Sequence, residues 1–130
     1  MIPVRLPPGV DLRRALEDVM KANGSGSAFV LSGIGSLTDP RLRFANAAVE
    51  TTLQGPYEIL TLSGTLTPDG AHLHMTVSDD QGRVFGGHLV YGNEIRTTAE
   101  VLLARAPDWV LTRELDPRTG FDELVVRPVE

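Results

Sequence analysis

The stretch of sequence that decides the fold is residues 59–90, ILTLSGTLTPDGAHLHMTVSDDQGRVFGGHLV. It contains three largely apolar runs whose length and β-branched content are typical of strands. Between them, proline, aspartate and glycine concentrate at residues 67–70 and 79–83, and these residue types are typical of tight turns. The stretch therefore predicts three consecutive antiparallel strands joined by two turns.

The second turn predicts which residues of the last two strands face one another. A three-residue loop over residues 80–82, with Gly82 in the left-handed conformation that such loops prefer, pairs residue 79 with residue 83. That register sets His74 opposite His88 and His72 opposite Val90. Because strand side chains alternate between faces, His72 and His74 share a face, and all three imidazoles emerge from one face of the hairpin.

Two other arrangements of this hairpin stay open on the sequence alone. A two-residue loop over residues 81–82 would pair Met75 with His88 and turn His88 to the opposite face. A β-bulge at residues 86–87 would also change the register, because a bulge adds an unpaired residue to one strand.

His72, His74 and His88 are the only histidines of the chain. Three neutral imidazoles that converge on one point are the ligand set of an open divalent-metal site, and zinc is the metal that this set favours. We therefore predict that the three histidines bind one zinc ion. The alternative is a histidine cluster, partly buried or at an interface, that ordinary hydrogen bonds hold together.

Glu100 is the carboxylate that the sequence singles out, because it lies in an otherwise apolar run over residues 98–103. A buried carboxylate is costly unless a cation or a hydrogen-bond donor meets it. Glu100 is therefore a candidate catalytic residue: a fourth metal ligand, a residue that orients a ligand, or a general base. The alternative is an ion pair with an arginine, within the chain or across a subunit interface.

Composition excludes several classes of protein and site. The 130 residues suffice for one core, so we expect a single domain over residues 1–130. Cysteine is absent, which excludes disulfides, thiolate metal sites and cysteine nucleophiles. The net charge of -5 argues against the basic face that nucleic-acid binding normally requires. With no run near the roughly eighteen apolar residues of a membrane helix and no signal peptide at residues 1–5, we predict a cytoplasmic protein without a membrane partner.

The rest of the chain predicts one helix and several more strands. Residues 11–22 carry apolar side chains at helical spacing behind the capping residue Asp11. Residues 42–53 suggest a strand pair or one bent strand, and residues 95–103 fit either a strand or a helix. A final hairpin is expected over residues 109–126. The predicted class is α+β, a mainly antiparallel sheet with one principal helix packed on it.

Four blocks of sequence, taken in order, resemble a known family. They are residues 32–37 (SGIGSL), 55–64 (GPYEILTLSG), 86–89 (GGHL) and 97–101 (TTAEV). Together they resemble the PPC domain, the plants-and-prokaryotes conserved domain, over roughly residues 3–127. The resemblance implies a compact α+β domain that assembles as a homotrimer. Bacterial members are called DNA-binding-protein-like, and in plant members the domain mediates self-association and contacts with transcription factors.

The chain departs from the plant pattern in two places. The family block Gly-Arg-Phe-Glu-Ile-Leu has Pro56 in place of its arginine, which puts in doubt any partner binding that rests on that arginine. The AT-hook core Arg-Gly-Arg-Pro is missing, so we expect weak or no direct DNA binding. A local patch of Arg41 and Arg43 is the alternative, against the simpler interpretation of solvated strand charge.

We therefore expect a small trimeric binding or regulatory module of the PPC type with a three-histidine metal site. Its partners would be copies of itself, together with a protein or small ligand at the metal. The alternative is a metal-dependent hydrolase or lyase that uses the same histidines with Glu100.

Overall fold

The computed structural model describes residues 1–24 and 26–130. The chain forms ten strands and one helix within this range. Their bounds are β1 Ile2–Leu6, α1 Leu12–Ala22, β2 Ala28–Leu37, β3 Arg41–Arg43, β4 Thr51–Thr52, β5 Tyr57–Thr67, β6 Gly70–Ser78, β7 Val84–Leu89, β8 Ile95–Arg105, β9 Trp109–Asp116 and β10 Phe121–Pro128.

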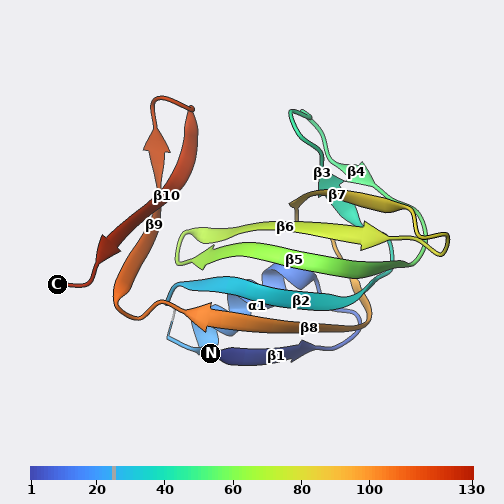
Figure 1. Ribbon diagram of the computed structural model, residues 1–130, viewed down its shortest axis with the longest axis horizontal. Helices are drawn as coiled ribbons and strands as arrows, with labels where there is room; N and C mark the ends of the chain where they lie inside the picture. The colour runs from blue at the N-terminus through green and yellow to red at the C-terminus, as the bar shows by residue number, and fades with distance from the viewer. Residues whose placement is uncertain (25) are drawn as a thin grey trace.

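Eight of the strands form one antiparallel sheet in the order β1-β8-β2-β5-β6-β7-β3-β4. Strands β9 and β10 form a separate two-stranded hairpin, which stands apart from the sheet at the left of Figure 1. The single helix lies behind the sheet in the same view. The predicted α+β class and the mainly antiparallel sheet are confirmed.

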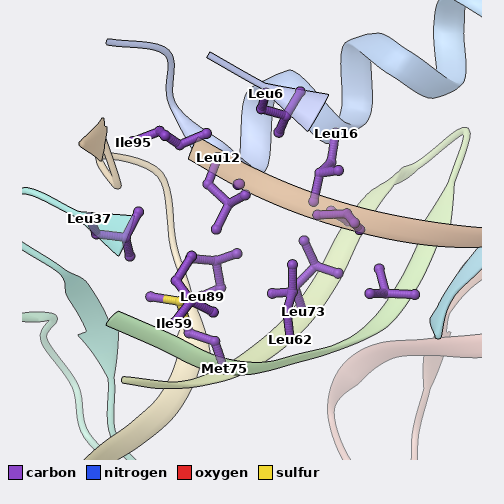
Figure 2. Packing of buried hydrophobic residues seen from close by; sticks show 14 of the residues in the cluster. Leu6, Leu12, Leu16, Leu37, Ile59, Leu62, Leu73, Met75, Leu89 and Ile95 are labelled. Atoms are coloured by element: carbon purple, nitrogen blue, oxygen red, sulfur yellow. The ribbon is translucent and has the colours of Figure 1, made fainter. Parts of the chain in front are cut away.

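Helix α1 covers the inner face of the sheet. Asp11 caps it by accepting a hydrogen bond from the Arg14 backbone N–H at 3.0 Å, which satisfies one of the free amides of the first turn. The helix buries Leu12, Leu16 and Met20 against inward-facing side chains of the sheet. Figure 2 shows this core, and the residues that it labels are Leu6, Leu12, Leu16, Leu37, Ile59, Leu62, Leu73, Met75, Leu89 and Ile95.

Within residues 1–24 and 26–130, no helix covers the outer face of the sheet. Phe29, Leu31 and Ile34 of β2 expose 41%, 54% and 52% of their surface, and Leu60 of β5 exposes 45%. We call these four residues the open apolar face. Scattered exposed apolar residues are ordinary, but a group of them on two neighbouring strands is typical of an interaction surface.

Two segments that the sequence left open now have definite structures. Residues 95–105 form strand β8 and not a helix, in keeping with the β-branched residues at positions 97, 98 and 101. The expected pair over residues 42–53 is present in shorter form, because Arg41 pairs with Thr52 and Leu42 with Thr51. No helix among the described residues is both long and apolar enough to cross a membrane.

Candidate metal centre

The turn between β6 and β7 has the three-residue loop that the sequence predicts. The Asp79 backbone N–H donates to the Arg83 carbonyl oxygen at 3.1 Å, and Gly82 adopts a left-handed φ of 77°. His74 consequently pairs with His88, which excludes the two-residue loop that would have turned His88 away. The paired ladder stops there, because β7 ends at Leu89, one residue before the predicted partner of His72.

Alternation along β6 directs the histidines outward. Leu73 and Met75 are buried in the core at 0% and 2% exposure, so the side chains of His72 and His74 project from the outer face. The short period of the strand therefore places two imidazoles on one face, two residues apart, above a packed apolar layer.

Arg13 of the helix holds together the ends of both histidine-bearing strands. Its guanidinium donates to the Ala71 carbonyl at 2.8 Å and to the Leu89 carbonyl at 3.2 Å. It also forms an ion pair with Glu17 at 3.4 Å, and only 16% of its side chain is exposed. Ala71 precedes His72 and Leu89 follows His88, so one partly buried side chain holds the backbone at both edges of the cluster.

The three imidazoles converge on one point. One ring nitrogen from each of His72, His74 and His88 can be chosen so that all three lie within 4.8 Å of one another. Ring centroids are 5.1 Å apart for His72 with His74, 5.1 Å for His72 with His88, and 5.5 Å for His74 with His88. The rings are close enough to share one ion.

The spacing of the nitrogens fits tetrahedral zinc. Two imidazole nitrogens at about 2.0–2.1 Å from a tetrahedral zinc ion lie about 3.3–3.4 Å apart. His72 Nε2 and His74 Nε2 are 3.3 Å apart, a distance that also allows a hydrogen bond between the two rings when no metal is bound. The candidate ligand atoms of all three imidazoles lie within 4.8 Å of one another.

The surroundings of the cluster favour the neutral form of His72 and His88. Partial burial, followed by the neighbouring His72 and Arg43, lowers the pKa of His88 from 6.5 to about 4. Partial burial, followed by the charge of Arg113, lowers the pKa of His72 as well. A neutral imidazole has a free lone pair for a metal, so the same environment that disfavours protonation favours coordination.

A row of residues crosses four strands at the level of the paired histidines. Ser63 of β5 pairs with His74, His74 pairs with His88, and His88 pairs with Arg43 of β3. Directly opposed residues in an antiparallel ladder share a face, so all four side chains lie on the outer face of the sheet. Arg43 therefore stands beside His88.

A second arginine reaches the cluster from the separate hairpin. The guanidinium of Arg113 in β9 donates to the Thr65 hydroxyl, and its backbone N–H donates to Asp69 Oδ2 at 2.9 Å. Thr65 is the cross-strand partner of His72, so Arg113 approaches the cluster from the side opposite Arg43. Glu123 of β10 lines a hollow of about 370 Å³ with His72 and His74.

Glu100 does not join the histidines, and the premise that its carboxylate is buried is wrong. Glu100 is exposed on β8, where alternation turns it to the outer face between its partners Arg5 and Ile34. Three strand spacings of about 4.8 Å separate β8 from β6, hence roughly 14 Å. Arg5 does not pair with it either, because the Arg5 guanidinium donates to Thr98 Oγ1 and to the Thr97 carbonyl.

Sequence reasoning missed the three arginines around the cluster. Patterns in the sequence assign no role to Arg13 or Arg113, and they single out Arg43 only as part of a patch with Arg41. Arg41 instead forms an ion pair with Glu50 at 2.8 Å. Only the pairing of β3 with β7 could have revealed the position of Arg43, because that pairing puts Arg43 next to His88.

The comparisons with known proteins agree with this fold. Residues 1–107 match the family model described as the Plants and Prokaryotes Conserved (PCC) domain. A bifunctional protein GlmU of Synechococcus is 46% identical over 127 residues, which are 98% of this chain but 20% of that protein. The chain thus spans about one fifth of the length of that relative, and the hairpin of β9 and β10 lies outside the family match.

Two solved structures share the fold. A hypothetical protein from Salmonella enterica has a TM-score of 0.94 and 35% identity, and the match covers 98% of this chain and 92% of that one. A protein from Archaeoglobus fulgidus, described as metal-containing, has a TM-score of 0.81 and 27% identity, with 95% of this chain and 91% of that one covered.

Proposed function

Because this chain belongs to the Plants and Prokaryotes Conserved (PCC) domain family, we propose that it is a binding module that holds one divalent metal ion, zinc by preference, between His72, His74 and His88. The observation that carries the proposal is the convergence of three imidazole nitrogens within 4.8 Å on one rigid sheet face. Three protein ligands leave one position of a tetrahedral ion open to a small ligand or a partner.

Three further observations support a metal at this position. The 3.3 Å between His72 Nε2 and His74 Nε2 matches the edge of a zinc tetrahedron. The lowered pKa values of His72 and His88 keep their lone pairs free at neutral pH. A relative of the same fold, at 27% identity, is described as metal-containing.

We also propose that the module assembles as a homotrimer through the open apolar face. The face places Phe29, Leu31, Ile34 and Leu60 on the uncovered side of two adjacent strands. Full burial of a fully exposed side chain of this kind contributes about 1.5–3 kcal/mol. These four already hide about half of their surface, so each would contribute about half of that, which still favours association over exposure to water. Glu100 lies beside Ile34, so an ion pair across the interface is the role left for its carboxylate.

A metal-dependent hydrolase is the second candidate, with a different carboxylate from the one that the sequence suggested. Glu123 lines the hollow that also contains His72 and His74, whereas Glu100 lies three strands away. In that case Glu123→Gln would abolish hydrolysis of a simple ester while leaving the metal content unchanged. A binding module without hydrolytic activity would show no difference between the two proteins.

The proposal is tested by elemental analysis of protein purified without a histidine tag, together with its mass from sedimentation equilibrium. One zinc ion per chain and three times the chain mass are expected. A metal-free protein after exposure to zinc would refute the first part, and a monomer at micromolar concentration would refute the second part.

A further inference from the structure

The row that crosses the histidine cluster borders a hollow on the side of the row where Thr76 and Gly86 lie. This hollow has a volume of about 490 Å³, and we call it the Arg43 pocket. The side chains that line it and carry polar groups include Arg43, Asn46, Ser63, His74, Thr76 and His88. Pockets of about 300–1,000 Å³ accommodate small organic ligands, so the hollow is larger than a single ion requires.

The absence of a side chain at Gly86 helps to open the pocket. Gly86 pairs with Thr76, two residues along the ladder from the pair of His74 and His88 and therefore on the same face. A Cβ atom at Gly86 would lie 3.2 Å from the methyl carbon of Thr76, so a larger side chain would crowd this part of the hollow. The sequence pair at residues 86–87 is thus part of the pocket and not a bulge.

The charges around the pocket are one-sided. The chain carries 17 acidic and 12 basic residues, yet the described residues that line this pocket include no carboxylate. Arg43 is its one arginine, and among residues 1–24 and 26–130 it forms none of the six ion pairs. The neighbouring hollow beside His72 differs, because it combines Arg13, Arg43 and Arg113 with three carboxylates.

An arginine without a carboxylate partner, beside imidazoles and hydroxyls, is suited to an oxyanion. Guanidinium groups bind carboxylate and phosphate oxygens through two parallel hydrogen bonds. The Ser63 hydroxyl and the Asn46 amide can donate to the remaining oxygens of such a ligand. A metal at the histidines would add positive charge on the same side of the pocket.

We propose that the Arg43 pocket binds the carboxylate or phosphate group of a small organic anion, held between Arg43 and the histidine cluster. The full affinity for the anion rests on the proposed metal site. The inference names the class of ligand that binds beside the open coordination position of that metal. The pocket volume leaves room for a carbon skeleton of a few atoms beyond the anionic group.

The test is a titration of ¹⁵N-labelled, zinc-loaded protein with inorganic phosphate and, separately, with acetate. The backbone amides of Gly86 and Gly87, which line the pocket, report binding through their chemical shifts. Arg43→Gln should weaken the binding of the anion by about tenfold or more, since a charge-assisted hydrogen bond is lost. Metal content should not fall in this variant, because Arg43 disfavours the positive charge of His88 and contributes no metal ligand.

Arg41→Gln is the matched control. Arg41 lies two residues before Arg43 on β3, and the substitution removes the same positive charge. The Arg41 guanidinium, however, pairs with Glu50 outside the pocket. Its affinity for the anion should equal that of the wild type. If both variants bind the anion equally weakly, the effect comes from the net charge of the protein and the inference is overturned. It is also overturned if the anion causes no chemical-shift change at the amides of residues 86–87.

Failure of the metal site and failure of the pocket are distinguishable. If the chain binds no zinc, the same titration on the metal-free protein still tests Arg43. Weaker binding that disappears in Arg43→Gln and persists in Arg41→Gln would support the pocket without the metal. If the zinc-loaded protein binds no anion, the metal proposal stands and the anion pocket is wrong.

Discussion

His74 lies directly opposite His88 across the β6–β7 hairpin, and this pairing decides what the outer face of the sheet can bind. It depends on a turn of three residues, in which Gly82 is left-handed with a φ of 77°. A loop shorter by one residue would have moved every side chain of one strand to the other face. The site is therefore built on paired strands, which position side chains more rigidly than loops do.

The hydrogen bonds of Arg13 lead to a prediction about the backbone that positions the histidines. Arg13→Met should lower the free energy of unfolding by about 1–3 kcal/mol, because two buried carbonyls lose a charged donor. Zinc affinity should fall as well, since the backbone on both sides of the cluster is released. Denaturant unfolding and a competitive zinc titration measure the two effects. Arg14→Met, on the next residue of the helix, is the control and should change zinc affinity little.

The lowered pKa of His88 makes the metal-free protein sensitive to acid. Its value is about 4 in the folded chain against 6.5 for an unperturbed histidine, so the unfolded chain binds more protons between these values. The contribution of neutral His88 to the free energy of unfolding is therefore fully present above pH 6.5, and it is lost as the pH decreases toward 4. Thermal unfolding of the metal-free protein across this range should show the loss. His88→Gln should show a smaller loss, and an equal loss would contradict the assignment.

If the open apolar face is the subunit interface, a single charged residue placed in it should prevent association. If the protein is the proposed trimer, Ile34→Glu should leave only monomers at micromolar concentration, because a charge would be buried at the proposed interface. Val49→Glu is the matched control, since Val49 exposes 73% of its surface in the segment between β3 and β4. Sedimentation equilibrium distinguishes the two. A trimer that survives Ile34→Glu would place the interface elsewhere.

Binding to duplex DNA is predicted to be weak and without sequence preference. The net charge is -5, and Arg41 is already engaged with Glu50. Electrophoretic mobility shifts at physiological salt, with AT-rich and GC-rich duplexes of equal length, measure this directly. Tight binding to one of the two sequences would contradict the prediction.

The sequence predicts much of this site because the pairing of His74 with His88 depends on residues that are close together in the chain. Strand period, the turn over residues 79–83 and the position of Gly82 lie close together in the chain, and they determine the pairing of His74 with His88. Glu100 was misjudged because an apolar run suggests burial on both faces of a strand. In this sheet one face is open, and alternation along β8 leaves Glu100 on that face.

The arginines could not be predicted in the same way. Arg43 meets His88 through the pairing of β3 with β7, and Arg13 meets both strands through the packing of the helix. Arg113 arrives from a separate hairpin and contacts Thr65, 48 residues earlier in the chain. Each relation depends on tertiary packing between segments far apart in sequence, which local patterns of residues do not encode.

The measurement that tests the central claim most directly is the zinc content per chain of untagged wild-type protein, His74→Ala and Glu100→Gln, each dialysed against the same zinc buffer. We expect one zinc ion in the wild type and in Glu100→Gln. In His74→Ala we expect little or no bound zinc, because the loss of a metal ligand lowers the affinity by more than about 100-fold, beyond what the loss of a hydrogen-bond partner of a ligand costs. Zinc retained equally by wild type and His74→Ala, or absent from the wild type, would contradict the three-histidine site.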